Sequence, residues 1–263
     1  MAINRAQLVK ELTPGLHALF GLEYDRYENE HEEIFDTETS ERAFEEEVML
    51  SGFGEATVKG EGAAVVYDTA QESFTARYSH ETVALAFALT EEAIEDNLYD
   101  TLSSRYTRAL ARSMSTTKQV KAANVLNNAF NSSFPGGDGK ELCATDHPTV
   151  ANIDQRNELS TAADLNEAFQ DERGLKINAQ ATKLIIPPAL QFTADRLMES
   201  PGRVNTSDND INAIRNMGMV SGGYAVNHYL TDTDAFFLKT DVPNGLKHFV
   251  RTPVATSMEG DFE

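Results

Sequence analysis

The stretch KLIIPPALQFTADRL, from Lys183 to Leu197, predicts a strand, a rigid corner and a helix in direct succession. Its apolar triplet Leu184–Ile186 is typical of a short buried strand. A residue that precedes a proline is pushed toward extended geometry, and Pro188 then suits the first turn of a helix. Apolar residues recur at helical spacing until Pro201-Gly202, where we expect the helix to end.

The composition is that of a folded protein of 263 residues, enough for one large or two small domains. The longest apolar run, Val83–Leu89, is far shorter than the ~20 residues that cross a bilayer, so we expect no membrane partner. The formal net charge of −20 argues against a protein whose main surface grips phosphates. A single cysteine, Cys143, excludes an internal disulfide, and a reducing compartment is the simplest interpretation.

The charges are segregated along the chain. Twelve carboxylates and only two arginines lie between Glu23 and Glu47, which gives this stretch a charge of −10. No acidic residue lies between Asp100 and Asp138, and that segment carries the five cations Arg105, Arg108, Arg112, Lys118 and Lys121. The chain therefore has an acidic arm and a basic segment, which are either two solvated faces or two halves of a contact.

A long helix is expected in the glycine- and proline-free window Ala63–Phe134. Thr90 can cap it, and helical spacing then continues to about Asn131. Such a helix would be roughly 60 Å long, whereas a compact globule of this chain length is about 45–50 Å across. Either the helix breaks near Ser115 or the molecule is elongated and buries its flanks against neighbours.

Other elements follow from turn residues. We expect a short helix at 5–12 that breaks at Pro14-Gly15, and a projecting hairpin with strands 44–50 and 63–78 around the glycine-rich tip 51–62. The turn cluster at 134–140 marks a boundary. Beyond it come a helix near 160–168, the Lys183–Leu197 stretch, and strands at 234–240 and 246–256, which make an α+β half.

Catalytic motifs are sparse. Cys143 and His147 could form a thiol–imidazole pair, but the turn residues around them favour a loop. Asp232 and Asp234 could hold a cation, but no third oxygen-rich segment accompanies them. We therefore expect no catalytic residue, no metal and no cofactor. The alternative function is a compact soluble enzyme that uses Cys143/His147 or Asp232/Asp234, or a small binding module.

Several stretches in order resemble tailed-bacteriophage major capsid (major head) proteins, in particular the phage Mu-type major head subunit group. They are ERAFEEEVMLSGFGEA, EGAAVVYD, HETVALAFALTEEAIEDNLYD, LCATDHPTVAN, LSTAADLNEA and ATKLIIPPALQFTADRLMESPGR. The resemblance covers the chain from about Tyr24 to Val254.

The resemblance implies the Hong Kong 97-type capsid fold, an α+β fold. Its parts would be an N-terminal arm at 1–37, an E-loop hairpin at 38–80, a peripheral domain with a long spine helix at 81–135, an axial domain at 136–240, and a return to the peripheral domain at 241–263. The implied function is a subunit that assembles as pentamers and hexamers into an icosahedral head enclosing double-stranded DNA. The protein would then reside in the virion, after assembly in the host bacterial cytoplasm.

Three groups of residues are expected to make assembly contacts. They are Phe53, Lys59 and Glu61 in the E-loop; Glu30, Glu32, Glu33 and Asp36 in the acidic arm; and Arg105, Arg108, Arg112, Lys118 and Lys121 in the spine segment. The acidic arm or E-loop base of one subunit would meet the basic segment of another. The rival placement turns the arginines inward, toward DNA.

The resemblance also implies partners. We expect a portal, a possible decoration protein and, because Met1 begins directly on the arm, a separate scaffolding protein. In the namesake fold an E-loop lysine is linked to a neighbour's asparagine, and Lys59 is the only lysine near this tip. Nothing in the sequence shows the asparagine and carboxylate that such a bond needs, so we expect no cross-link.

Overall fold

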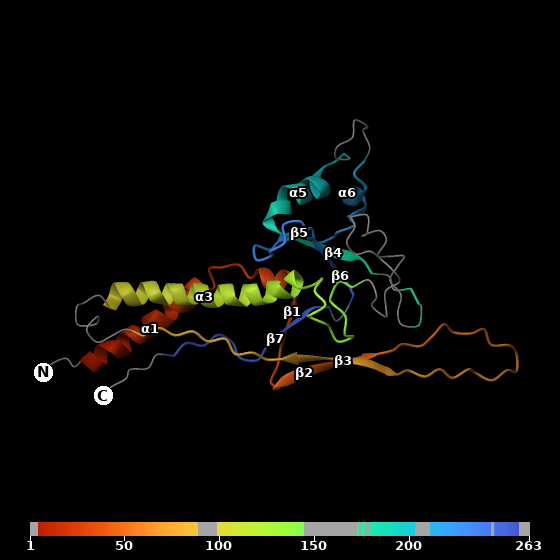
Figure 1. The fold of residues 1–263 in the computed structure, drawn as a ribbon, viewed down its shortest axis with the longest axis horizontal. Helices are drawn as coiled ribbons and strands as arrows, with labels where there is room; N and C mark the ends of the chain where they lie inside the picture. The colour runs from red at the N-terminus through yellow and green to blue at the C-terminus, as the bar shows by residue number, and fades with distance from the viewer. Residues whose placement is uncertain are drawn as a thin grey trace.

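The structure, a computed structural model, describes residues 5–88, 99–144, 173, 175–176, 179–202, 211–242 and 245–257. Two long helices lie side by side, a smaller unit of sheet and helices rises beside one end of them, and a β-hairpin projects away from the body (Figure 1). Helices and strands are both present and largely separate along the chain, which fits the expected α+β class.

The strand, corner and helix expected at Lys183–Leu197 are confirmed. β4 (Ala181–Ile186) ends at Pro187, whose extended backbone leads into the 3₁₀ helix η2 (Pro188–Leu190) and then α5 (Gln191–Glu199). β4 lies at the centre of a three-stranded sheet, parallel to β5 (Tyr224–Val226) and antiparallel to β6 (Phe237–Thr240).

The apolar triplet of β4 is buried on both faces of this sheet. Leu184 and Ile186 belong to one core cluster, with Ala194 of α5, and Ile185 belongs to another. Successive side chains of a strand point to opposite faces, so a strand covered on both sides has no solvent-facing position. This explains why the run carries no polar alternation.

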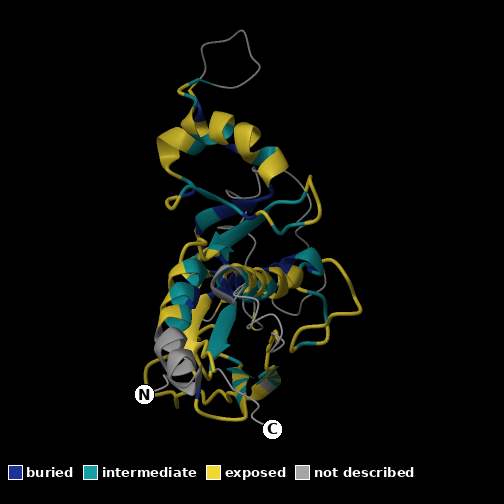
Figure 2. Ribbon diagram, turned by 90° about the vertical axis from the view of Figure 1, so that its left-hand side faces the viewer, coloured by how far each residue is buried: buried dark blue, intermediate teal, exposed yellow. Residues whose placement is uncertain are grey.

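The second core cluster ties the smaller unit to the rest of the molecule. In it Ile185 packs with Ile34 and Phe35 of the N-terminal part and with Leu126 of the long helix. Buried residues gather around β4 and the adjoining end of the long helix, and the outer faces of the helices are exposed (Figure 2). The short helix α6 (Ala213–Met217) packs against α5 and is capped by the Asn212 side chain, which accepts a hydrogen bond from the Ile214 N–H.

The two long helices are α1 (Arg5–Tyr24) and α3 (Tyr99–Asn127), and they pack against each other. α3 runs without interruption through Ser115, so a break there is excluded, and the molecule is elongated (Figure 1). Burial of its flanks against neighbours stays a prediction. Its 29 residues span about 43 Å at ~1.5 Å per residue. The expected cap, Thr90, lies outside the described residues.

Two helix boundaries were predicted wrongly. α1 continues through Pro14-Gly15, because packing along α3 outweighs the backbone hydrogen bond that a proline removes. α3 ends at Asn127, four residues before the expected end. There the Asn128 side-chain amide donates to the Asn124 carbonyl oxygen, a local bond that competes with continuation of the helix.

The N-terminal part beyond α1 crosses α3 and joins the C-terminal strand. It forms the 3₁₀ helix η1 (Glu30–Glu33) and β1 (Asp36–Thr39), which pairs in parallel with β7 (Lys247–Val250). We call residues 25–39 the arm. The pairing joins segments about 210 residues apart, which no local sequence pattern could reveal.

The projecting hairpin is confirmed, with one difference. β2 (Phe44–Leu50) pairs antiparallel with β3 (Glu72–Ser79), and the expected second strand from Ala63 begins nine residues later. Residues 51–71 extend beyond the paired strands and form the far end of the projection (Figure 1). We call residues 51–71 the hairpin tip.

Candidate functional site

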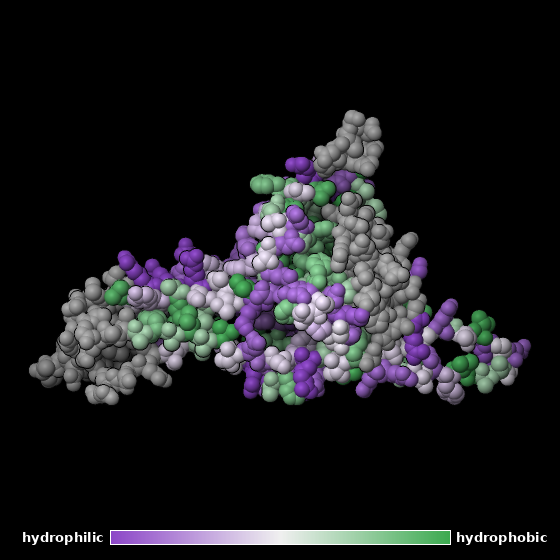
Figure 3. All heavy atoms as spheres, in the orientation of Figure 1, coloured by the Kyte–Doolittle hydropathy of each residue, from purple (hydrophilic) through white to green (hydrophobic). Residues whose placement is uncertain are grey.

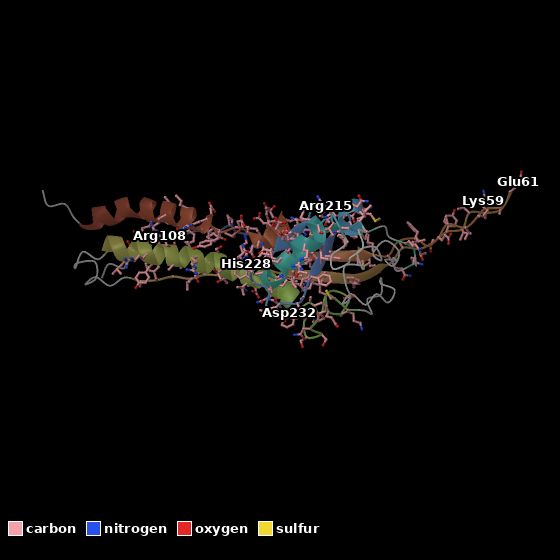
Figure 4. All side chains as sticks on the ribbon, turned by 90° about the horizontal axis from the view of Figure 1, so that it is seen from above. Lys59, Glu61, Arg108, Arg215, His228 and Asp232 are labelled. Atoms are coloured by element: carbon pink, nitrogen blue, oxygen red, sulfur yellow. The ribbon has the colours of Figure 1, made fainter. Side chains whose placement is uncertain are left out.

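The hairpin tip carries exposed apolar side chains at a distance from both cores. Phe53 is 61% exposed, Tyr67 is 93% exposed and Val58 is completely exposed. Lys59 and Glu61 lie at the far end (Figure 4), and hydrophobic side chains are visible there among polar ones (Figure 3). Apolar groups at the end of a projection contribute stabilising free energy only when another surface covers them and removes them from water.

Side-chain bonds hold the two legs of the tip together. The Gly54 N–H donates to Asp68 Oδ2 at 2.8 Å, and the Gln71 N–H donates to Ser51 Oγ at 2.9 Å. The Gly54 and Thr69 N–H groups lower the pKa of Asp68. The tip is therefore a pre-shaped extension with a carboxylate that stays ionised.

The acidic arm finds its cations within the same chain. Lys183 of β4 pairs with Glu33, and Lys239 Nζ of β6 lies 2.9 Å from Asp36 Oδ1. Glu30 accepts two hydrogen bonds from His228, one from the backbone N–H at 2.8 Å and one from Nδ1 at 2.7 Å. Figure 4 shows His228 in the central part of the molecule, where the smaller unit meets the arm.

Glu32 and the base of the hairpin complete this network. Glu32 Oε1 accepts a hydrogen bond from Asn29 Nδ2 at 2.9 Å. Lys247 of β7 contacts two carboxylates, Glu47 of β2 and Glu38 of β1, the latter at 3.2 Å, and only 11% of its side chain is exposed. Because it joins the arm to the hairpin, Lys247 couples the positions of both.

The sequence did not single out these cations. Lys183 is part of the quoted stretch, and Lys239 and Lys247 lie in the expected strands, but their partners are distant along the chain. Each is a polar residue within a partly apolar strand. A lysine within a partly apolar strand was the one feature of the sequence that could have indicated an ion pair on the surface of that strand.

The basic segment of α3 divides into two parts. Lys121 pairs with Glu81, and Lys118 is partly buried near Glu32, with its pKa lowered by burial. Arg105, Arg108 and Arg112 are exposed, and no ion pair joins them to any residue in the described ranges. At spacings of three and four residues they form one stripe on the helix, which we call the arginine stripe.

A shallow groove of about 500 Å³ continues from this stripe along α3. It is lined by Ala109, Arg112, Ser113, Thr116, Thr117, Val120 and Lys121. Its floor thus combines apolar groups with hydroxyls and two cations. Such a surface suits a segment that brings both apolar side chains and carboxylates.

The two candidate catalytic pairs gain no support. Burial raises the pKa of the Cys143 thiol to about 11, and His147 lies outside the described residues. Asp232 Oδ1 accepts a hydrogen bond from the Asp234 N–H at 3.0 Å, and both side chains are exposed, as in an ordinary solvated turn. Within the described part of the chain, no three metal-ligating side chains come together.

The comparisons agree with the architecture. A family model described as "Phage capsid protein" matches residues 73–263, which is most of the chain. No curated protein matches the sequence. Among the described residues, no helix is long and apolar enough to cross a membrane.

Proposed function

The chain belongs to the phage capsid protein family, and we propose that it is the major head subunit of a tailed phage, with the Hong Kong 97-type fold. Family membership gives it a structural role in the virion, in a shell built from copies of itself, rather than an enzymatic one. The family match over residues 73–263 is the observation that carries the proposal. The Mu-type subgroup remains part of the proposal, since it rests on sequence resemblance alone.

We propose that the domain division follows the expected order. The hairpin of β2, β3 and the tip corresponds to the E-loop, α3 to the spine helix, and the unit of β4, β5, β6 and α5 to the axial domain. The N-terminal segment at 1–37, which contains most of the arm, and the return at 241–263 would belong beside the peripheral part. The pairing of β1 with β7 supports that placement, because it joins these two segments.

We also propose how copies contact one another. The arm and hairpin-base carboxylates are engaged within their own chain, and so is Asp68 of the tip, so Glu55 and Glu61 of the hairpin tip become the better partners for a neighbour's cations. The tip has two more acidic than basic residues and exposed apolar groups. The α3 groove of another copy combines apolar groups and hydroxyls with Arg112 and with Lys121, which already pairs with Glu81. Charge and hydropathy therefore match between the two surfaces.

The remaining parts of the proposal concern the whole head. Copies would form pentamers and hexamers around double-stranded DNA, with a separate scaffolding protein, a portal and possibly a decoration protein as partners. The virion would be assembled in the host bacterial cytoplasm. Lys59 lies at the tip without any arrangement that supports a covalent link, so we propose non-covalent contacts there.

Negative-stain microscopy with light scattering tests the proposal on the purified chain, with and without the neighbouring scaffold gene. We expect closed shells, or rings with five- and six-fold symmetry. A stable monomer near 29.0 kDa under every condition would overturn it. Co-expression that changes neither yield nor shell size would count against the scaffolding protein alone.

A further inference from the structure

Two histidines from opposite ends of the chain meet in the interior. His31 of η1 is only 1% exposed, and its ring lies 5.2 Å from that of His248 of β7, edge to face at 82°. The Nδ1 atoms of both rings are buried and have no hydrogen-bond partner among the described residues. Buried polar atoms are usually satisfied, and among the described residues only Asn227 Nδ2 shares this lack of a partner.

The pair lies where the arm is fastened to the body. Gln119 of α3, itself buried, accepts the His31 backbone N–H at 3.0 Å, and its amide reaches the Glu28 carbonyl oxygen at 3.4 Å. Five residues after His31, the Asp36 N–H donates to the Leu246 carbonyl oxygen as β1 joins β7. His31 and His248 are thus on the two segments that must separate if the arm leaves.

The surroundings accommodate neutral imidazoles and oppose charged ones. Burial and then the Lys118 ammonium of α3 lower the pKa of both rings. The Glu32 carboxylate of η1 raises both pKa values, and a hydrogen bond with the Gln119 side chain raises that of His31, but burial outweighs these effects. Each ring also faces the other, so one protonated imidazole disfavours a second. A protonated ring has two N–H donors, and here each ring already has one nitrogen without an acceptor.

We propose that His31 and His248 form an acid-sensitive latch that holds the arm on α3 and β7 at neutral pH and releases it under mild acid. The latch is a property of the single chain and does not depend on the proposed shell. Release would also affect the hairpin, because Lys247, next to His248, contacts Glu38 of β1 and Glu47 of β2. Lys247 would then lose Glu38 and keep Glu47, so release would remove the link that Lys247 makes between the arm and the hairpin.

The direction of the pH effect follows from linkage. Burial, reinforced by Lys118 and then His248, lowers the pKa of His31 from 6.5 to about 4, and burial also lowers the pKa of His248. Between those pH values a released arm binds a proton that the docked arm cannot, so acid favours release. For His31 alone, the equilibrium constant for release rises roughly 30-fold at pH 5 relative to pH 7.5.

Hydrogen exchange of the full chain at pH 7.5 and pH 5 tests the latch. The protection factors of the Asp36 and Ser40 amides report the arm, because these N–H groups bond to β7 or its flank. We expect both factors to fall by roughly 30-fold or more at pH 5. The Leu184 amide, bonded to the Gly223 carbonyl oxygen, should change little and serves as the internal reference.

Variants separate the latch from other titrating groups. In the double variant His31→Gln/His248→Gln, the fall in the Asp36 and Ser40 protection factors at pH 5 should disappear. In His17→Gln, a variant away from the arm, the same fall should remain. A loss of the same size in the double variant would overturn the proposal. If that variant does not fold, the histidine ring resonances of the unaltered chain are titrated instead. The proposal is overturned if both His31 and His248 titrate near pH 6.5 or above.

Discussion

At the scale of single residues, Gly222 is fixed by the close approach of two backbones. A Cβ atom there would lie 2.6 Å from the Thr182 carbonyl oxygen, which also accepts the Gly222 N–H. We expect Gly222→Ala to destabilise the sheet around β4 by roughly 1–3 kcal/mol, because the backbone of β4 must shift to relieve the contact. Thermal unfolding should show a melting temperature lower by about 2–4 °C per kcal/mol.

Gly60→Ala is the matched control for this change. Gly60 lies in the hairpin tip with open space where a Cβ would be placed. The same substitution should be neutral there, or stabilising by up to ~1 kcal/mol through a less flexible unfolded chain. Equal destabilisation by both variants would contradict the close approach at Gly222.

Cys143 gives a second residue-level prediction, on reactivity. With its pKa raised from 9.0 to about 11, the native thiol at pH 8 has a thiolate fraction about 100-fold below that of an ordinary cysteine. A thiol-reactive disulfide reagent should therefore label the native chain at least 100-fold more slowly than the unfolded chain. Fast labelling of the native chain near neutral pH would revive the thiol–imidazole alternative.

At the scale of elements, the sequence predicted what local chemistry controls. The prolines and apolar triplet at Lys183–Leu197 specify their own strand, corner and helix. The continuation of α1 through Pro14 depends on α3, and the β1–β7 pairing depends on residues at the other end of the chain. Such non-local contacts leave no local pattern.

For the candidate surfaces, too, the sequence predicted the local features and missed the contacts between distant segments. The exposed tip residues Phe53, Lys59 and Glu61 could be picked from composition and glycine punctuation. The sequence could not reveal the lysines that neutralise the arm, or the contact between His31 and His248, because each of these interactions joins elements distant in sequence. A charge count shows that acids need partners but not which cations provide them.

The docking of the arm onto α3 gives an element-level prediction. Gln119→Leu should keep α3 helical but leave the buried His31 N–H without its acceptor, at a cost of about 1–3 kcal/mol. We expect limited proteolysis to cut the arm faster, with unchanged far-ultraviolet circular dichroism.

Thr116→Leu is the control on the same helix, since Thr116 is exposed and does not face the arm junction. It should leave the rate of arm cleavage as it is in the unaltered chain. Unaltered arm cleavage in Gln119→Leu would show that the side chain of Gln119 does not hold the arm.

At the scale of the whole molecule, charge reversal in the arginine stripe tests which way α3 faces in the proposed shell. If α3 receives a neighbour's hairpin tip, Arg108→Glu replaces attraction by repulsion at every repeated contact. One exposed pair contributes only ~0–1 kcal/mol, but several contacts per subunit should raise the protein concentration needed for assembly by about tenfold or more. Added salt should narrow the difference between variant and unaltered chain, because exposed charges are screened.

The rival orientation, with the stripe turned toward DNA, makes a different prediction for the same variant. Shells would then form at the ordinary concentration, and they would package less DNA, since an acidic lining would lose cations that offset its repulsion of phosphate. Light scattering measures the first quantity and the DNA content of purified heads the second. Arg196→Glu on α5 makes the same charge change away from α3, so a loss of assembly specific to Arg108→Glu assigns the stripe to contacts between subunits.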